Sequence, residues 1–114
     1  MNCQKYADKY GFILICPDGL YDSWYINSPA LRGSQYQDFF FFDLVPRMEK
    51  AFRVDKKNVF ITGLSMGGHG ALYLFSQNSS VFRAAGSLSG AVDLKTCYTD
   101  YGIPLYLGLK NDVR

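Results

Sequence analysis

The sequence predicts an α/β domain in which helices flank a parallel sheet of about three strands. Short apolar runs at residues 12–16 and 58–62, and a run of small residues at 82–90, each end at turn-forming residues. Helical patterns separate these runs, and strands that alternate with helices form parallel sheets through right-handed crossovers. A hydrophobic content of 48% with 17% aromatic residues is typical of a folded chain, and 114 residues correspond to one domain at most.

The first strand follows a short helix. Residues 2–10 have the character of a surface helix, and Gly11 is placed to cap its C-terminal end. The run at 12–16 is too short for a helix, and continuous apolar character is typical of a strand buried on both faces of a parallel sheet. Cys16 is then expected to be a small buried residue. Residues 17–33 are rich in turn formers and predict a long loop.

A second helix is predicted from Ser34 to about Phe52. Ser34 and Gln37 have the spacing of a capping box, and Asp38 favours the same helix end through the helix dipole. The run of four phenylalanines at 39–42 covers more than one helix face, so part of it should be covered by other structure. Pro46 predicts a kink. Towards the C-terminal end, residues 103–109 could form a short strand or a loop.

The stretch at 59–72 predicts a strand, a tight turn and a helix, with Ser65 at the apex of the turn. Gly63, Ser65 and Gly67 form the pattern G-x-S-x-G, and Gly68 follows directly. Such a turn presents a nucleophilic serine, and its glycines let strand and helix approach each other. The backbone amide of Met66 would then point to where an oxyanion forms. The alternative is a glycine-rich turn with an incidental serine.

Charge and cysteine content argue against several other functions. The 12 basic residues are scattered among 10 acidic ones, which argues against binding nucleic acid or an anionic membrane. Three cysteines without C-x-x-C spacing suggest neither a zinc site nor a disulfide framework. No apolar run has the length of a membrane span or the character of a signal peptide, so we expect a cytoplasmic location by default.

The loop at 17–33 contains the only tryptophan, Trp24, followed by Tyr25. Loops that leave the carboxyl ends of parallel strands lie where open α/β sheets bind ligands. Trp24 and Tyr25 are therefore candidate walls of a substrate pocket. Packing within the loop is the alternative interpretation of both residues.

Three stretches of the sequence together resemble serine esterases of the α/β-hydrolase superfamily: residues 10–19, the Ser-x-Tyr-x-Asp-Phe pattern at 34–39, and the Asp-Leu-Val-Pro pattern at 43–46. The stretch at 60–72 is especially similar to the esterase D group, which includes S-formylglutathione hydrolases and tributyrin, feruloyl and acetyl-xylan esterases. The related mycolyltransferases share this architecture. The resemblance covers about residues 5–93.

The resemblance implies a carboxylic-ester hydrolase that transfers an acyl group through Ser65, with the Met66 amide as an oxyanion donor. It implies no metal or organic cofactor, and a small-molecule or carbohydrate-linked ester as substrate. The family has the chain order serine, acid, histidine, and His69 would be a structural residue behind the nucleophile. A makeshift base is the alternative for His69. Asp93 and Asp100 are candidates for the pocket rim only.

Residues 1–114 are accordingly expected to form a single incomplete α/β-hydrolase domain, a central fragment with the nucleophile but without its own catalytic acid and histidine. Two alternatives remain. The chain could be a catalytically inactive module that forms homo-oligomers through open sheet edges. It could also be an acyltransferase of the same superfamily.

Overall fold

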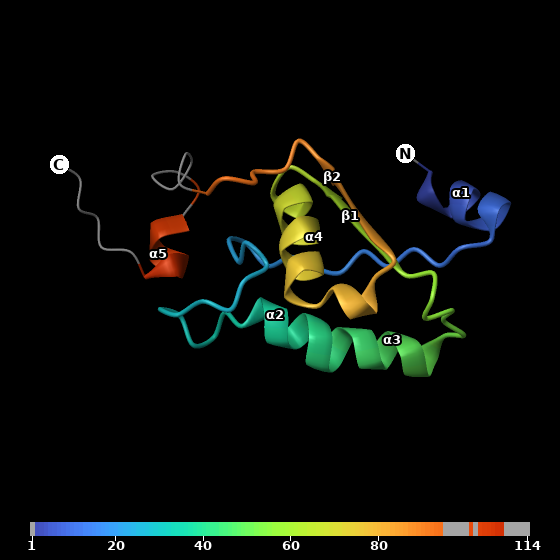
Figure 1. Cartoon of the computed structure of the whole chain (residues 1–114), viewed down its shortest axis with the longest axis horizontal. Coiled ribbons are helices and arrows are strands. Elements are labelled where there is room, and N and C mark those ends of the chain that lie inside the picture. Colours follow the sequence, from blue (N-terminus) through green and yellow to red (C-terminus); the bar gives the residue numbers. More distant parts are fainter. Residues whose placement is uncertain (1, 95–100, 102, 109–114) are drawn as a thin grey trace.

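The structure, a computed structural model of the chain, describes residues 2–94, 101 and 103–108. Helices alternate with two strands, which confirms the α/β class (Figure 1). In chain order the elements are α1 (Cys3–Tyr10), α2 (Tyr36–Asp38), the π-helix η1 (Phe39–Leu44), α3 (Val45–Ala51), β1 (Phe60–Leu64), α4 (Met66–Gln77), the 3-10 helix η2 (Ser79–Val81), β2 (Ala84–Leu88) and α5 (Ile103–Leu107).

The sheet within the described residues is a parallel pair, β1 and β2, connected by α4. Its register joins Phe60 to Ala84 at one end and Leu64 to Leu88 at the other. The strand predicted at 58–62 is present as β1. It begins at Phe60, two residues later than predicted, because the backbone amide of Asn58 closes a turn onto the Asp55 carbonyl. The helix predicted after Ser65 and the strand predicted at 82–90 are both present, as α4 and β2.

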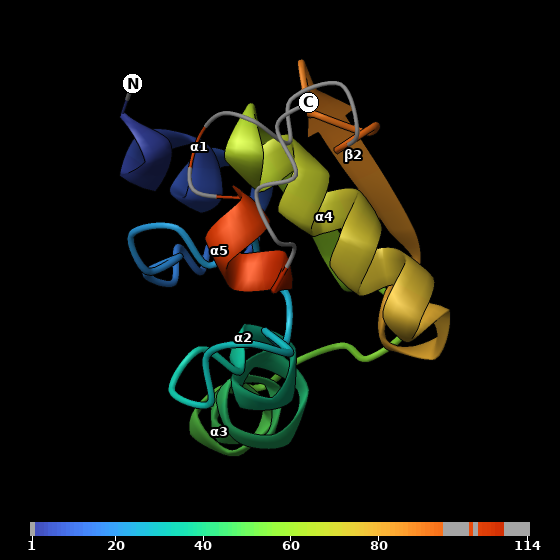
Figure 2. The same ribbon diagram turned by 90° about the vertical axis from the view of Figure 1, so that its left-hand side faces the viewer.

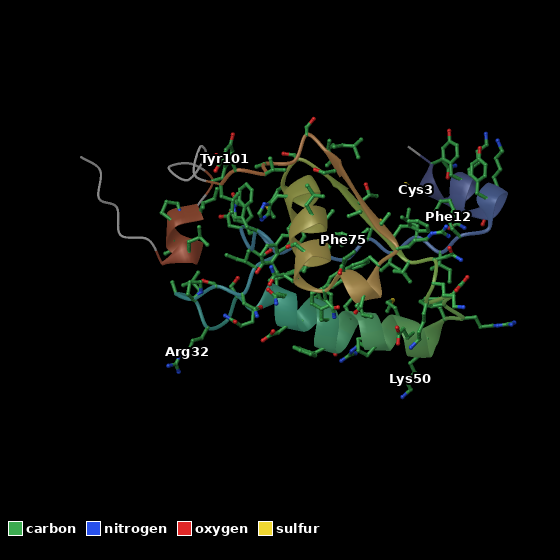
Figure 3. The ribbon with its side chains drawn as sticks, viewed as in Figure 1. Cys3, Phe12, Arg32, Lys50, Phe75 and Tyr101 are labelled. Carbon is green, nitrogen blue, oxygen red and sulfur yellow. The ribbon has the colours of Figure 1, made fainter. Side chains whose placement is uncertain are left out.

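The prediction of a strand at 12–16 is wrong, because the described structure has no strand there. The segment has no strand assignment, and its apolar side chains are exposed, with Ile13 51% accessible. Cys16 is likewise exposed rather than buried. Figure 3 labels Phe12 directly after α1, which ends at the left-handed Gly11 as predicted. An apolar run becomes a strand only when a neighbouring strand accepts its backbone hydrogen bonds, and this segment pairs with none.

The second helix runs from Tyr36 to Ala51 as α2, η1 and α3, seen end-on below α4 in Figure 2. The predicted capping box does not form, because the Ser34 hydroxyl is buried without a hydrogen-bond partner. The neighbouring Gln35 is engaged in a bridge to Asn27, and its side chain caps loop carbonyls instead. Pro46 lies in the first turn of α3, directly after the wide turns of η1. A π-helical turn accommodates the missing amide donor in this position.

A cluster of phenylalanines joins the second helix to α4 and the strand layer. Phe82 is buried, and its ring lies 6.0 Å from Phe40, 6.3 Å from Phe41 and 6.3 Å from Phe75. Figure 3 labels Phe75 on α4. Part of the phenylalanine run is thus covered by other structure, as predicted, through Phe40 and Phe41. Phe42, by contrast, is 79% exposed.

For residues 103–109 the sequence allowed either a short strand or a loop. The structure instead has a helix there, α5, from Ile103 to Leu107. Ile103 at its start is fully buried. None of the described helices combines the length and the apolar character that crossing a bilayer would require.

Candidate active site

Ser65 occupies the sharp turn between β1 and α4, with φ 54° and ψ −118°. A positive φ is unfavourable for a residue with a side chain and costs on the order of 1–3 kcal/mol, so the surroundings must hold it. Two hydrogen bonds do so. The Ser65 amide donates to the Leu88 carbonyl at 2.9 Å, and the His69 amide donates to the Ser65 carbonyl at 3.1 Å. The turn is thus fixed to the end of β2 and to the first turn of α4.

Glycines allow the strand and the helix to approach closely around this turn. A Cβ on Gly63 would lie 2.2 Å from the carbonyl oxygen of Gly67, and a Cβ on Gly68 would lie 2.9 Å from the Cα of Gly90. Both positions therefore exclude any side chain. Gly67 differs, since its Cβ would meet only the Tyr25 hydroxyl at an ordinary 3.7 Å. The backbone of Gly67, rather than its missing side chain, is what the turn requires.

The Ser65 side chain is exposed and does not cap the helix that follows it. The first bond from α4 back to the turn comes from the amide of His69, so the amides of Met66, Gly67 and Gly68 precede the helical ladder. Free amides at a helix N-terminus favour negative charge through their hydrogens and the helix dipole. The Met66 amide is one of the amides that precede the helical ladder, and it follows the exposed Ser65 directly in the chain.

His69 is buried on α4, with 8% of its surface exposed. Its Nδ1 lies 3.0 Å from the Ala91 carbonyl oxygen, and its ring packs against Trp24 at 5.5 Å and Tyr73 at 5.9 Å. Burial lowers the pKa of His69, and the backbones of Ala91 and Trp24 offset part of this shift. The buried Nε2 has no hydrogen-bond partner. The side chains of Ser65 and His69, both of which the structure describes, make no hydrogen bond to each other.

The two candidate pocket residues adopt left-handed backbone conformations, with φ 48° at Trp24 and 62° at Tyr25. Trp24 is 5% exposed, and its indole donates to the Tyr101 carbonyl at 3.2 Å, near the position that Figure 3 labels. Tyr25 is partly exposed, and its ring lies so close to α4 that a Cβ on Gly70 would sit 2.2 Å from the ring. The Tyr25 side chain thus runs along the first turns of α4 with its hydroxyl near Gly67.

Two residues hold this loop in a way that the sequence did not predict. Tyr36 is 1% exposed, donates its hydroxyl to the Asp18 carbonyl at 3.0 Å, and meets the Tyr25 ring edge-on at 5.0 Å. Burial raises the pKa of Tyr36 to about 12, with smaller contributions from Tyr25 and Asp18. Ser23 is fully buried, donates to the Gly19 carbonyl and accepts from the Tyr25 amide. A serine after a Pro-Asp-Gly turn is the one local signal that could have indicated such a loop.

The remaining polar residues do not form a metal site. The part of the chain that the structure describes contains no group of three His, Cys, Asp or Glu side chains placed to bind a metal ion. Asp93 is exposed after β2. Asp100, the second candidate for the pocket rim, and Cys97 lie outside the described residues.

Comparison with known proteins adds the family. The family model described as "Putative esterase" matches residues 12–100, which include the loop at 17–33, the turn at Ser65 and both strands. No curated protein and no solved structure matches the chain. The family match covers most of the chain and supports an enzyme that hydrolyses esters in general. The chain belongs to the putative esterase family.

Proposed function

We propose that this chain is a serine carboxylesterase in which Ser65 is the nucleophile. The observation that supports this most strongly is the strained backbone of Ser65, held between β1 and α4 with its hydroxyl exposed. Strain of this kind persists only where the surrounding structure enforces it, and it is typical of functional turns. An incidental serine in a glycine-rich turn would not need a positive φ.

The proposed reaction is acyl transfer in two steps. The Ser65 oxygen attacks the ester carbonyl carbon, its proton passes to a base, and the carbonyl oxygen becomes an oxyanion near the Met66 amide. The oxyanion then collapses and expels the alcohol, which takes up the proton. A water molecule then attacks the acyl-serine as the base takes its proton. The second oxyanion collapses and releases the acid, and the Ser65 oxygen takes the proton back from the base. The reaction as written needs no metal or organic cofactor.

Among the described residues, no side chain is placed to act as the base for Ser65. The described residues hold only one histidine, His69, and its Nδ1 is directed to Ala91 rather than to Ser65. Its buried Nε2 packs between aromatic rings, as a structural histidine would. Because the members of a catalytic triad act as a unit, we expect this chain alone to turn over slowly.

The substrate is proposed to be a small-molecule or carbohydrate-linked ester that passes the Tyr25 side chain. The Tyr25 hydroxyl lies next to Gly67, two residues after Ser65, and the side chain is partly exposed. Trp24 supports this wall from behind, since it is buried against His69. An aromatic wall beside the nucleophile is suited to an apolar acyl or aryl group.

The test is hydrolysis of p-nitrophenyl acetate by the purified chain, its Ser65→Ala variant and a matched Ser79→Ala variant. Ser79 is exposed at the start of η2, which follows α4, and takes no part in the turn at Ser65. We expect release of p-nitrophenol by the wild type and by Ser79→Ala, and only the background rate with Ser65→Ala. Equal rates in all three proteins would contradict the assignment of Ser65.

A further inference from the structure

Tyr25, Tyr36 and Tyr73 each pack against a neighbouring ring, but their hydroxyls are used differently. The Tyr36 hydroxyl donates to the Asp18 carbonyl at 3.0 Å, and the Tyr73 hydroxyl donates to the Gln37 side chain at 2.7 Å. The Tyr25 hydroxyl forms no hydrogen bond within the described residues, although its backbone amide does. Its proton is therefore available to a bound molecule.

The side chain of Tyr25 is directed towards the N-terminal end of α4. Its ring begins beside Gly70, where a Cβ would lie 2.5 Å from the ring atom Cγ. Its hydroxyl reaches Gly67, where a Cβ would lie 3.7 Å from the oxygen. These two glycines are separated by about 4.5 Å of helix rise, so the ring runs along the helix axis. Ser65, which directly precedes α4, lies two residues further in the same direction.

The loop holds the Tyr25 side chain firmly in this direction. Trp24 and Tyr25 both have a positive φ, which is unfavourable for residues with large side chains. The Ser23 hydroxyl accepts from the Tyr25 amide at 3.1 Å and donates to the Gly19 carbonyl. Gly19 leaves room for the ring, since a Cβ there would lie 2.8 Å from the Tyr25 oxygen. A donor fixed in this way needs no reorganisation when negative charge develops beside it.

We propose that the Tyr25 hydroxyl is an oxyanion donor, which binds the carbonyl oxygen of the ester while Ser65 attacks the carbonyl carbon. This role rests on the proposed function of Ser65. Tyrosine hydroxyls are among the groups that stabilise oxyanions, and Tyr25 would act together with the Met66 amide. The hydroxyl donates a hydrogen bond and keeps its own proton through both steps. Burial, and to a smaller extent the charge of Asp18, raises the pKa of Tyr25, so the hydroxyl is protonated at neutral pH.

The test compares hydrolysis of p-nitrophenyl acetate by the wild type, Tyr25→Phe, Tyr73→Phe and Ser65→Ala. Tyr25→Phe keeps the ring beside Gly70 and breaks no hydrogen bond of the described fold, so it should be as stable as the wild type. We expect its kcat to fall at least about tenfold with KM unchanged. The reason is that loss of one oxyanion donor lowers kcat on the order of 10²–10³-fold in a complete active site.

Tyr73→Phe is the matched control, because it removes a hydroxyl that is bonded to Gln37. Its kcat should stay within about twofold of the wild type. A thionoester of the same acid and alcohol then separates a hydrogen-bond donor from a pocket wall. Sulfur replaces the carbonyl oxygen and accepts hydrogen bonds only weakly. The wild type should prefer the ester, and Tyr25→Phe should reduce this preference, whereas loss of a mere wall would slow both substrates equally.

The results distinguish this role from the proposed function itself. Hydrolysis that needs Ser65 but has the same kcat in Tyr25→Phe would overturn the role of Tyr25 and leave Ser65 as the nucleophile. An effect on KM alone, an unchanged preference for the ester, or an equal loss of kcat in Tyr73→Phe would overturn it as well. A wild type no faster than Ser65→Ala would contradict the proposed function, and the role of Tyr25 with it.

Discussion

Replacement of Gly63 by alanine tests whether the close approach of β1 and α4 fixes the turn at Ser65. The added Cβ would lie 2.2 Å from the Gly67 carbonyl oxygen and 2.3 Å from its carbonyl carbon. Ordinary contacts of a methyl group begin near 3.4 Å, so strand and helix would have to separate by about 1 Å. Both obstructing atoms are backbone, and no side-chain rotation can relieve the overlap.

We expect Gly63→Ala to lower the free energy of unfolding by about 3 kcal/mol, the upper end of the range for overpacking. In a domain of this size the melting temperature should fall by roughly 12–20 °C. The separation would also loosen the contact between Gly68 and Gly90 on the same helix face. The position of the Ser65 hydroxyl should change with it.

Two other glycines supply matched controls. Gly67→Ala places a Cβ only 3.7 Å from the Tyr25 hydroxyl, and Gly33→Ala places one in open space. We expect both to stay within about 0.5 kcal/mol of the wild type, apart from a gain of up to about 1 kcal/mol at Gly67 from helix propensity. Denaturant unfolding followed by circular dichroism measures all three. A Gly63→Ala variant as stable as Gly33→Ala would refute this account of the turn.

Three further predictions concern the groups around the turn. Because burial lowers the pKa of His69, the folded state favours its neutral form, so stability should decline relative to His69→Asn as the pH falls below about 6.5, as unfolding titrations would show. Tyr36→Phe removes the hydrogen bond to Asp18 and should cost about 1 kcal/mol. Because the pKa of Tyr36 is raised to about 12, its protonated form stabilises the fold at neutral pH. The wild type should lose this contribution to the free energy of unfolding as the pH rises from about 10 through 12, and Tyr36→Phe should not. Phe82→Ala empties the centre of the phenylalanine cluster and should cost about 3–5 kcal/mol in thermal or denaturant unfolding, whereas Phe42→Ala should be nearly neutral.

The sequence predicts those parts of the fold that depend on local patterns. The strand before Ser65, the turn itself and α4 follow from an apolar run, two glycines and a helical segment that are adjacent in the chain. The run at 12–16 has an equally clear strand pattern, yet it forms no strand because pairing depends on a neighbour that no local pattern contains. Ser34 does not cap the second helix, because backbone hydrogen bonds from this stretch to the loop place the start of the helix at Tyr36. The Ser34 hydroxyl is left without a partner.

The turn at Ser65 was predictable from the sequence, and the arrangement of the residues around it was less so. The spacing of Gly63, Ser65 and Gly67 implies the strained turn directly. The placement of Tyr25 along α4 depends on left-handed backbone conformations at Trp24 and Tyr25, which residues with large side chains seldom adopt. The buried hydroxyl of Ser23 and the bond from Tyr36 to Asp18 hold that conformation, and they connect positions that no helical or strand period relates.

The central claim is that Ser65 is the nucleophile, and covalent capture tests it most directly. The full chain is incubated with a fluorophosphonate, which phosphonylates activated serine hydroxyls and releases fluoride, and the modified peptide is identified by mass spectrometry. This readout needs only the first step of the reaction and does not depend on turnover by water. We predict one phosphonyl group per chain on Ser65, present in Ser79→Ala and absent in Ser65→Ala. An unmodified Ser65, or modification of another residue at the same rate, would contradict the account.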